Sequence, residues 1–256
     1  MPKLIDAHIH LEKYTDREII EMLKYRNLEG LITVSSDLES SKRNAILSRQ
    51  YKKVHSAFGF HPEQPLPSSE DIEKLITWIS QNKESMVAIG EVGLPYYERN
   101  GRSEKDFPLA PYIELLEVFI QLAKDWNKPI VLHAIYEDAQ LVCNLLEKYS
   151  ITKAHFHWFK GDFKTISRMK ANGYNISITP DVVYEKEIQQ LVIDYPLEYL
   201  MVETDGPWPF EGPFHGQRTH PIMIEESIKV MAKLKSITLK DAYNQLLQNT
   251  KTFYRL

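Results

Sequence analysis

Cysteine and long apolar runs are both nearly missing from this sequence. Its 256 residues include a single cysteine, Cys143. One cysteine excludes an internal disulfide and a zinc finger built on a Cys-x-x-Cys pair, and it is typical of a reducing compartment. No stretch approaches the roughly 18 to 20 apolar residues of a membrane span, and no basic segment followed by an apolar signal-peptide core opens the chain. We therefore expect a cytoplasmic protein without membrane contact.

A strong excess of one charge is missing as well. The sequence has 31 Lys and Arg against 35 Asp and Glu, a formal charge of −4, and 43% of its residues are hydrophobic. This composition excludes disordered and collagen-like chains. The mild acidic balance gives no support for a broad nucleic-acid-binding face, although it leaves room for a local basic patch.

Short apolar runs recur along the chain, and segments with helical periodicity lie between them. Eight runs predict strands, at Leu4 to Ile9, Leu31 to Val34, His55 to Phe58, Val87 to Val92, Ile130 to Leu132, Ala154 to Trp158, Asn175 to Ile178 and Leu200 to Val202. Helices are predicted at Asp16 to Tyr25, Asp71 to Ile79, Ile113 to Trp126, Leu141 to Tyr149, Phe163 to Met169, Ile222 to Leu234 and Leu239 to Leu247.

Strands that alternate with helices predict an α/β fold with a parallel sheet, and strands that are apolar throughout predict helices on both of its faces. Eight such units are the count of a TIM-type (β/α)8 barrel, which we expect to form one domain over residues 1–256. An open doubly wound sheet is the alternative. The first βα turn has no glycine-rich phosphate fingerprint and the chain has no Walker A sequence, which disfavours that alternative.

Side chains that bind metals stand at the C-terminal ends of several predicted strands. They are His8, His10, Glu91, His133, His157 and Asp205. Because these strand ends converge on one face of a barrel, we expect the six residues to lie within coordination distance of one another. Imidazole and carboxylate together suit Zn²⁺, Mn²⁺, Ni²⁺ or Fe²⁺ better than Mg²⁺. Four histidines and two carboxylates exceed one zinc site with an open position, which indicates two divalent metal ions, with zinc as the leading choice.

Some of these polar and aromatic residues also have plain structural interpretations. Asp205 could cap the turn that follows it. His55 and His155 fall inside predicted strands and are interpreted as core histidines. Aromatic residues of the loops at the same face could stack on a base or sugar, or could be ordinary loop packing, and they are Tyr96, Tyr97, Trp158, Trp208 and Phe210.

Six motifs follow one another along the chain. They are Ile5-Asp6-Ala7-His8-Ile9-His10, Gly59-Phe60-His61-Pro62, Ile89-Gly90-Glu91-Val92-Gly93-Leu94, the strand that ends in His133, His157-Trp158-Phe159-Lys160-Gly161 and Glu203-Thr204-Asp205-Gly206-Pro207. In this order they resemble the TatD family of metal-dependent hydrolases, within the amidohydrolase superfamily. Asn249 to Phe253 resembles the C-terminal end of that family, so the resemblance covers essentially the whole chain.

The resemblance implies how two metal ions would be held. His8 and His10 would bind the first ion, and His133 and His157 would bind the second. Glu91 would bridge the two ions and so belong to the catalytic machinery.

The resemblance also implies the other catalytic roles and shows where this chain departs from the family. Asp205 would bind the first metal and orient or deprotonate the attacking water, and His61 would contact a phosphate or leaving group of the substrate. Pro95 stands where the family usually has an acidic residue, Ile135 where it often has an arginine, and Thr219 where it has an asparagine. These changes spare the expected metal ligands but weaken the expectation of a nuclease substrate.

The leading hypothesis is therefore a metal-dependent hydrolase of ester bonds, specifically a phosphodiesterase or deoxyribonuclease that uses a hydroxide activated by two metals. The first alternative is an amidohydrolase-type enzyme acting on a small amide, lactone or phosphoester. The second is a non-catalytic metal-binding barrel. The expected partner is DNA or a small phosphoester substrate, with no obligate protein partner, and we expect a monomer.

Overall fold

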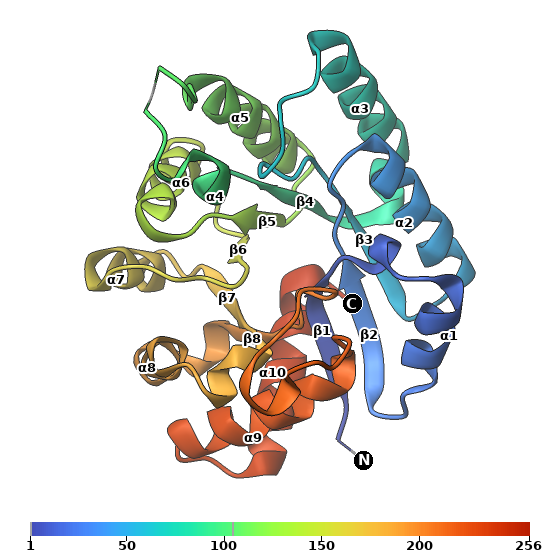
Figure 1. The fold of residues 1–256 in the computed structure, drawn as a ribbon, viewed down its shortest axis with the longest axis vertical. Coiled ribbons are helices and arrows are strands. Elements are labelled where there is room, and N and C mark those ends of the chain that lie inside the picture. Colours follow the sequence, from blue (N-terminus) through green and yellow to red (C-terminus); the bar gives the residue numbers. More distant parts are fainter. Residues whose placement is uncertain (1, 104) are drawn as a thin grey trace.

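Eight parallel strands form one sheet in chain order (Figure 1). They are β1 (Leu4–Ile9), β2 (Leu28–Thr33), β3 (Val54–Phe58), β4 (Met86–Gly93), β5 (Ile130–His133), β6 (Ala154–Phe156), β7 (Asn175–Ile178) and β8 (Leu200–Val202). The structure is a computed structural model, which describes residues 2–103 and 105–256. Each strand pairs in parallel with the next one along the chain. The predicted TIM-type barrel is confirmed.

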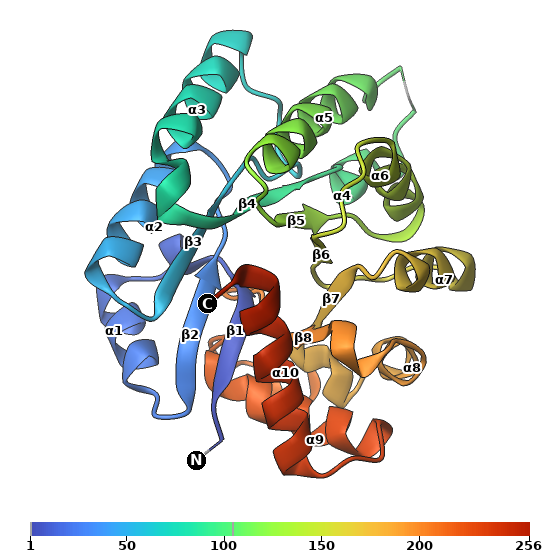
Figure 2. The same ribbon diagram turned by 180° about the vertical axis from the view of Figure 1, so that it is seen from behind.

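The two ends of the sheet meet where β8 approaches β1, and both views of the ribbon show these strands side by side (Figures 1 and 2). Backbone hydrogen bonds join the segments at their carboxyl ends. The N–H of Asp205 donates to the carbonyl of His8 at 2.9 Å, and the N–H of His10 donates to the carbonyl of Gly206 at 2.8 Å. Two segments that carry predicted site residues therefore hold each other in place.

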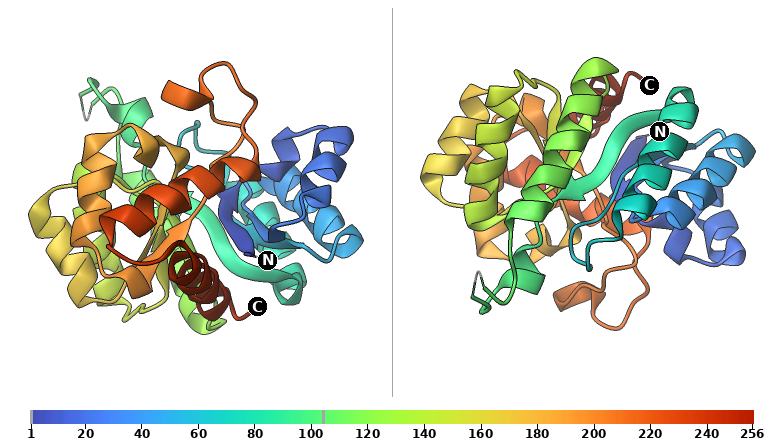
Figure 3. Two further views of the ribbon diagram at one scale, coloured as in Figure 1. Left: turned by 90° about the horizontal axis from the view of Figure 1, so that it is seen from below. Right: turned by 90° about the horizontal axis from the view of Figure 1, so that it is seen from above.

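Helices surround the strands, as the end views show (Figure 3). They are α1 (Asp16–Lys24), α2 (Leu38–Gln50), α3 (Ser69–Asn82), α4 (Tyr96–Arg99), α5 (Ala110–Asp125), α6 (Tyr136–Lys148), α7 (Phe163–Ala171), α8 (Lys186–Asp194), α9 (Ile224–Leu234) and α10 (Leu239–Tyr254). The sequence patterns do not predict α2, α4 or α8. They also place His157 and Trp158 inside the sixth strand, whereas both residues lie in a turn beyond the end of β6. Among the described residues, no helix is long and apolar enough to cross a membrane.

Local side-chain contacts set the starts of several helices. The Thr15 hydroxyl accepts the N–H of Glu18 at the start of α1, and the Glu18 carboxylate accepts the N–H of Thr15 in return. Asp37 and Ser40 form the same reciprocal pair before α2. Each such cap satisfies backbone groups that a helix end leaves free and contributes about 1 kcal/mol.

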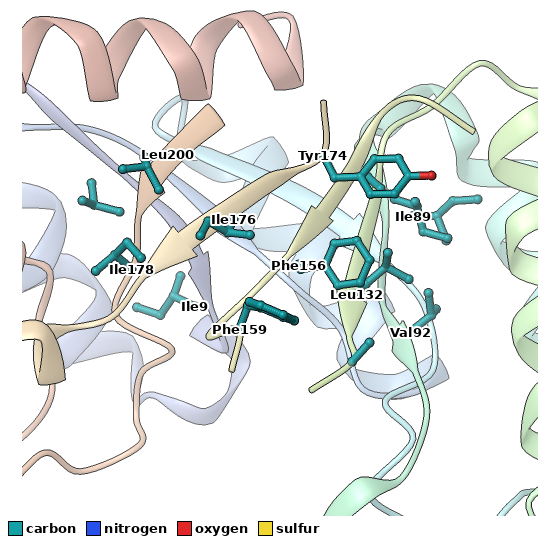
Figure 4. Close-up of a cluster of buried hydrophobic side chains, with 14 of the residues drawn as sticks. Ile9, Ile89, Val92, Leu132, Phe156, Phe159, Tyr174, Ile176, Ile178 and Leu200 are labelled. Carbon is teal, nitrogen blue, oxygen red and sulfur yellow. The ribbon is translucent and has the colours of Figure 1, made fainter. Parts of the chain in front are cut away.

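Apolar side chains fill both sides of the strands. Between the strands and the outer helices lie the residues labelled in Figure 4, among them Ile89, Leu132, Phe156 and Ile176. Residues on the other face of the strands form a second cluster with Phe253 and Tyr254 of α10, and this cluster contains Ile5, Ala7, Ile32, Val34, Ala57, Ala88, Val131 and Met201. The barrel interior is therefore packed with side chains at one end, and the polar residues described next occupy its carboxyl end.

Candidate metal centre

The structure brings the six predicted metal-binding residues together at the carboxyl ends of the strands. His8 lies in β1 and His10 directly follows it, Glu91 lies in β4, His133 ends β5, His157 follows β6 and Asp205 follows β8. All six are buried. The convergence that the sequence predicts is therefore what the structure has.

Glu91 lies at the middle of this cluster and is fully buried. Its Oε2 is 3.2 Å from Nε2 of His8 and 3.2 Å from Nε2 of His10. Its Oε1 is 3.0 Å from Nδ1 of His133 and 2.6 Å from Nε2 of His157. Each carboxylate oxygen thus faces a different pair of histidines.

Asp205 adds a second carboxylate on one side of the cluster. Its Oδ1 lies 3.3 Å from Nε2 of His8 and 3.5 Å from Nε2 of His10. Its backbone has a φ of 47°, in the left-handed region that few residues other than glycine, Asn and Asp adopt. Such backbone strain gathers at functional sites, where the surrounding structure holds it in place.

A glycine makes room for one of the histidines. A Cβ placed on Gly93, at the end of β4, would lie 1.9 Å from the carbonyl oxygen of His133 on the neighbouring strand. Any side chain at this position would push β5 away from β4, and His133 would leave the cluster.

Several atoms that face one another here are left without hydrogen bonds. Nε2 of His8, Oε2 of Glu91 and Oδ1 of Asp205 are buried and have no hydrogen-bond partner among the described residues. Buried polar atoms without partners are costly and rare in folded proteins. Three triplets place their nitrogen and oxygen atoms within 4.8 Å of one another: His8 with Glu91 and His157, His8 with His10 and Asp205, and His10 with His61 and Glu91. This donor set fits a transition metal, which would satisfy the unpaired atoms.

Electrostatics keep the central carboxylate ionised. Burial opposes the charge of Glu91, but the neighbouring imidazoles of His157, His61 and His8 outweigh it and hold the pKa of Glu91 well below its usual value. Burial lowers the pKa of His157 to about 4, against the attraction of Glu91.

At His8 and His133 the same effect of burial is outweighed by Glu91, and at His133 also by Glu63, so the pKa of His8 lies well above its usual value and that of His133 is raised to about 9. A metal would therefore displace a proton from each of these two rings. A neutral imidazole with a free lone pair and an ionised carboxylate are the protonation states that bind a metal.

His61, predicted to contact substrate, lies inside the same cluster. Its Nε2 is 3.4 Å from Oε1 of Glu91, and 20% of its side chain is exposed. Its Nδ1 accepts the backbone N–H of Glu63 at 3.1 Å, and burial lowers its pKa. The neutral imidazole therefore carries its proton on Nε2, which points into the site as a hydrogen-bond donor.

Three glutamates behind the histidines were not predicted from the sequence. Oε1 of Glu12 is 3.5 Å from Nδ1 of His10, Oε1 of Glu63 is 3.0 Å from Nε2 of His133, and Oε1 of Glu203 is 3.9 Å from Nδ1 of His157. In each case the nitrogen is the one that points away from Glu91. For Glu12 and Glu63 the available signal is a carboxylate two residues after a histidine.

The structure separates the aromatic residues of this face into two groups. Phe210 is buried and packs with Phe214 and Met223, so it belongs to the loop core. Tyr97 and Trp208 are 62% and 59% exposed. The Tyr97 ring centroid lies 6.2 Å from that of His133, and Trp208 lies 6.1 Å from Trp158. These two exposed rings are free to contact a ligand.

Comparison with known proteins identifies the family. The sequence profile described as TatD related DNase matches residues 5–255. The chain belongs to the TatD family. An uncharacterized metal-dependent hydrolase of Haemophilus influenzae is 40% identical over 254 residues, which are 99% of this chain and 100% of that protein. A human TatD-related deoxyribonuclease is 29% identical over 269 residues, covering 99% of this chain and 95% of the human protein.

The fold of the TatD family is also seen in solved structures. The crystal structure of YjjV, a TatD homologue from Escherichia coli, matches with a TM-score of 0.86 and 22% identity, covering 99% of this chain and 98% of that chain. This likeness concerns the fold. Together with the profile and the relatives, it places the chain among the metal-dependent hydrolases of the TatD family.

Proposed function

We propose that this protein is a phosphodiesterase that cleaves DNA with two divalent metal ions. The observation that carries the proposal is the Glu91 carboxylate, whose two oxygens face different histidine pairs at 2.6 to 3.2 Å. Such a carboxylate suits a bridge between two cations. His8, His10 and Asp205 would hold one ion, and His133 and His157 the other. The nitrogen-rich ligand set favours zinc, and manganese, nickel, iron and magnesium are the other candidates.

Bound divalent cations supply Lewis acidity, which makes water easier to deprotonate and offsets the charge that builds up on the attacked group. Asp205 supplies the base. Burial works against its charge, but the close contact with His8 and the charges of the nearby histidines hold the pKa of Asp205 below its usual value, so the carboxylate is ionised and able to accept a proton. The water oxygen bonds to phosphorus, its proton passes to Asp205, and the bond to the leaving oxygen breaks. The leaving oxygen takes a proton from solvent.

The remaining groups would bind and orient the substrate. Nε2–H of His61 points into the site and would donate a hydrogen bond to a phosphate oxygen. The exposed rings of Tyr97 and Trp208 would stack on bases, which contributes about 1–3 kcal/mol per base. A strand whose bases are unpaired presents such faces, so single-stranded DNA is the substrate form that this surface suits.

A smaller substrate is the second candidate. Ile135 is only 4% exposed, so the position at which an arginine was expected offers no phosphate donor. Arg99 is bonded to the buried Asp138, and Arg218 to Glu18. Because these two arginines are already paired with carboxylates, they are not free to bind the phosphates of a polyanion. This favours an amide, lactone or small phosphoester as the substrate.

The decisive experiment compares substrate classes on metal-loaded protein. Cleavage of a labelled single-stranded oligonucleotide is measured beside hydrolysis of small ester, amide and lactone substrates, with and without chelator. We expect oligonucleotide cleavage that is lost with chelator and in the variants His8→Ala and Asp205→Asn. His215→Ala is the control, because His215 is an exposed loop histidine bonded to Glu211.

The other outcomes select the other functions. Hydrolysis of small substrates alone would replace the nuclease proposal with the amidohydrolase alternative. Stoichiometric metal binding without any hydrolysis would support the non-catalytic barrel. Oligonucleotide cleavage that survives chelation and both site variants would contradict the proposal.

A further inference from the structure

One of the glutamates behind the histidines, Glu63, is held by hydrogen bonds at both of its carboxylate oxygens. The Oε1 of Glu63 lies 3.0 Å from Nε2 of His133 and also accepts the N–H of Tyr97 at 2.8 Å. Its Oε2 accepts the N–H of Glu98 at 2.8 Å. Both oxygens therefore have backbone donors from α4, and the side chain of Glu63 is only 12% exposed.

The loop that carries Glu63 is anchored as well. The N–H of Glu63 donates to Nδ1 of His61 at 3.1 Å. The side-chain amide of Gln64 donates to the carbonyls of Ser36 and His61, at 2.8 and 2.9 Å. The Tyr112 hydroxyl donates to the carbonyl of Gln64 at 2.9 Å. A carboxylate held at both its backbone and its oxygens presents a fixed acceptor rather than a mobile one.

This fixed acceptor decides which nitrogen of His133 faces the metal centre. Metal binding requires the neutral ring, and when Nε2–H donates to Glu63 the one remaining proton is on Nε2 and the lone pair is on Nδ1. Nδ1 is the atom that lies 3.0 Å from Oε1 of Glu91 and 3.1 Å from Nε2 of His157. The other tautomer would present Nδ1–H to the cluster, and a ring flipped about its Cβ–Cγ bond would present a C–H. Neither could bind a cation there.

We propose that Glu63 is the positioning residue of the metal centre: it sets the tautomer and the ring orientation of His133, and it ties that histidine to the α4 segment that carries Tyr97. This inference deepens the proposed function and rests on the metal-binding part of it. The contacts join three segments that are distant in the chain, the loop after β3, the end of β5 and the segment after β4. Glu63 thus fixes the position of His133 relative to the α4 segment that carries the exposed ring of Tyr97.

The test measures metal binding without substrate. Metal-free wild-type protein, Glu63→Gln and Glu63→Ala are titrated with cobalt(II), by calorimetry and by the visible absorption of the bound ion. Glu63→Ala removes both acceptor oxygens, and we expect its affinity for cobalt to fall by about 10- to 100-fold at one of two sites. This is the range typical for groups that orient a metal ligand. Glu63→Gln keeps the shape and one acceptor oxygen, so we expect a smaller loss.

Glu98→Gln is the matched control. Glu98 is next to the same contact, but it provides its backbone N–H, and its side chain is 45% exposed beside Arg102. Its cobalt affinity should equal that of the wild type. Glu63→Gln is nearly isosteric, so a binding result is obtained even if Glu63→Ala fails to fold.

A spectroscopic readout separates positioning from general stability. Proton–nitrogen correlation spectra of histidine-labelled, zinc-loaded protein should show the proton of His133 on Nε2 in the wild type, with a downfield resonance that weakens or moves in Glu63→Gln. Unchanged cobalt affinity in both Glu63 variants, or a His133 proton on Nδ1, would overturn the inference. Wild-type protein that binds cobalt at two sites and cleaves nothing ends the nuclease proposal but leaves this one standing. If the wild type cleaves the oligonucleotide and the Glu63 variants bind cobalt as tightly as the wild type, the nuclease proposal stands and the inference about Glu63 is overturned.

Discussion

Two groups of buried polar residues share the barrel interior, and they differ in whether their hydrogen bonds are satisfied. Around Glu91, atoms of His8 and Asp205 face one another without hydrogen-bond partners among the described residues. A second group is bonded throughout: the Tyr254 hydroxyl pairs with Nδ1 of His155 at 2.7 Å, Nε2 of His155 with Ser177 at 2.5 Å, and the Ser177 hydroxyl donates to Glu203 at 2.5 Å. The first group has the chemistry of a site that binds something, and the second that of a structural network.

The two groups also differ in protonation. Burial raises the pKa of Glu203 to about 8, so this carboxyl is mostly protonated and uncharged at neutral pH. Burial and the neighbouring charges of His8 and His157 lower the pKa of His155 well below its usual value. Neutral groups that satisfy one another need no external partner. The ionised carboxylates of the Glu91 cluster do.

The largest effect that would test this difference is expected from Asp205→Asn. Asparagine has the same shape and tolerates the left-handed backbone at this position, but it cannot accept a proton. We expect kcat to fall by about 10²- to 10⁴-fold, the range for loss of a general base. The midpoint of thermal unfolding should fall only slightly, because Asn keeps the shape of the side chain and loses only the attraction of the neighbouring histidines that lowers the pKa of Asp205. A large loss of stability would place Asp205 in the structural group.

Metal removal should follow in size. Chelation takes away the partner of the Glu91 cluster and leaves its charges to face one another. If the free concentration of the ion is 100 times its dissociation constant, removing the ion lowers the free energy of unfolding by about 2.7 kcal/mol. The measurement is thermal unfolding with and without chelator, followed by restoration with zinc. Identical unfolding curves would show that the Glu91 cluster, like the network around His155, needs no bound metal for stability.

The structural network should show the opposite response. Tyr254→Phe removes the hydroxyl that pairs with Nδ1 of His155 and leaves a buried nitrogen without a partner. We expect the free energy of unfolding to fall by about 1–3 kcal/mol in urea denaturation. Metal content and kcat should be unchanged. A loss of activity at full stability would join this network to the catalytic machinery.

A smaller effect is expected at the mouth of the site. Tyr97→Ala removes an exposed ring whose centroid lies 6.2 Å from that of His133. We expect KM for a single-stranded oligonucleotide to rise several-fold, equivalent to about 1 kcal/mol of lost stacking, with kcat nearly unchanged. Tyr97→Phe keeps the ring and should keep the wild-type KM. Equal KM values in all three proteins would exclude stacking on Tyr97.

The smallest effect is expected outside both groups. Lys42 and Glu39 form an ion pair of 2.7 Å on the surface of α2, with side chains 43% and 79% exposed. Exposed pairs of this kind contribute about 0.5 kcal/mol or less, so Lys42→Ala should change neither stability nor activity beyond that level. A larger change would mean that surface charges influence this protein as strongly as its buried groups.

The apolar runs predicted the strands well, because strands buried on both faces have a signal that survives without tertiary context. The helix α2 lacked such a signal. Its inward face carries Asn44, which is fully buried and bonded to Thr33, Val34 and Ser35. A polar residue on the buried face hides the apolar periodicity that identifies a helix, although it satisfies its partners in the folded protein.

The site shows the same division between local signal and tertiary context. The clustering of His8, Glu91 and Asp205 was predictable, because burying such side chains at the ends of apolar strands is costly unless they have partners there. The role of Glu63 was not, since this glutamate follows His61 by two residues in the chain but contacts a different histidine, His133, once the loop is folded. Pro95 stands where the family usually has an acidic residue. The folded chain places the Glu63 carboxylate beside the segment that follows Pro95.

The sequence by itself determined the barrel, the set of candidate metal-binding side chains and the face that they share. Periodicity and strand order are local properties of the chain, and eight parallel units can close in only a few ways. Only the tertiary structure decided that the two oxygens of Glu91 face different histidine pairs, that His61 presents Nε2–H to the cluster, and that Glu63 orients His133. Those features depend on distances of about 3 Å between residues far apart in the chain, and hydrogen bonds of that length are set by packing rather than by pattern.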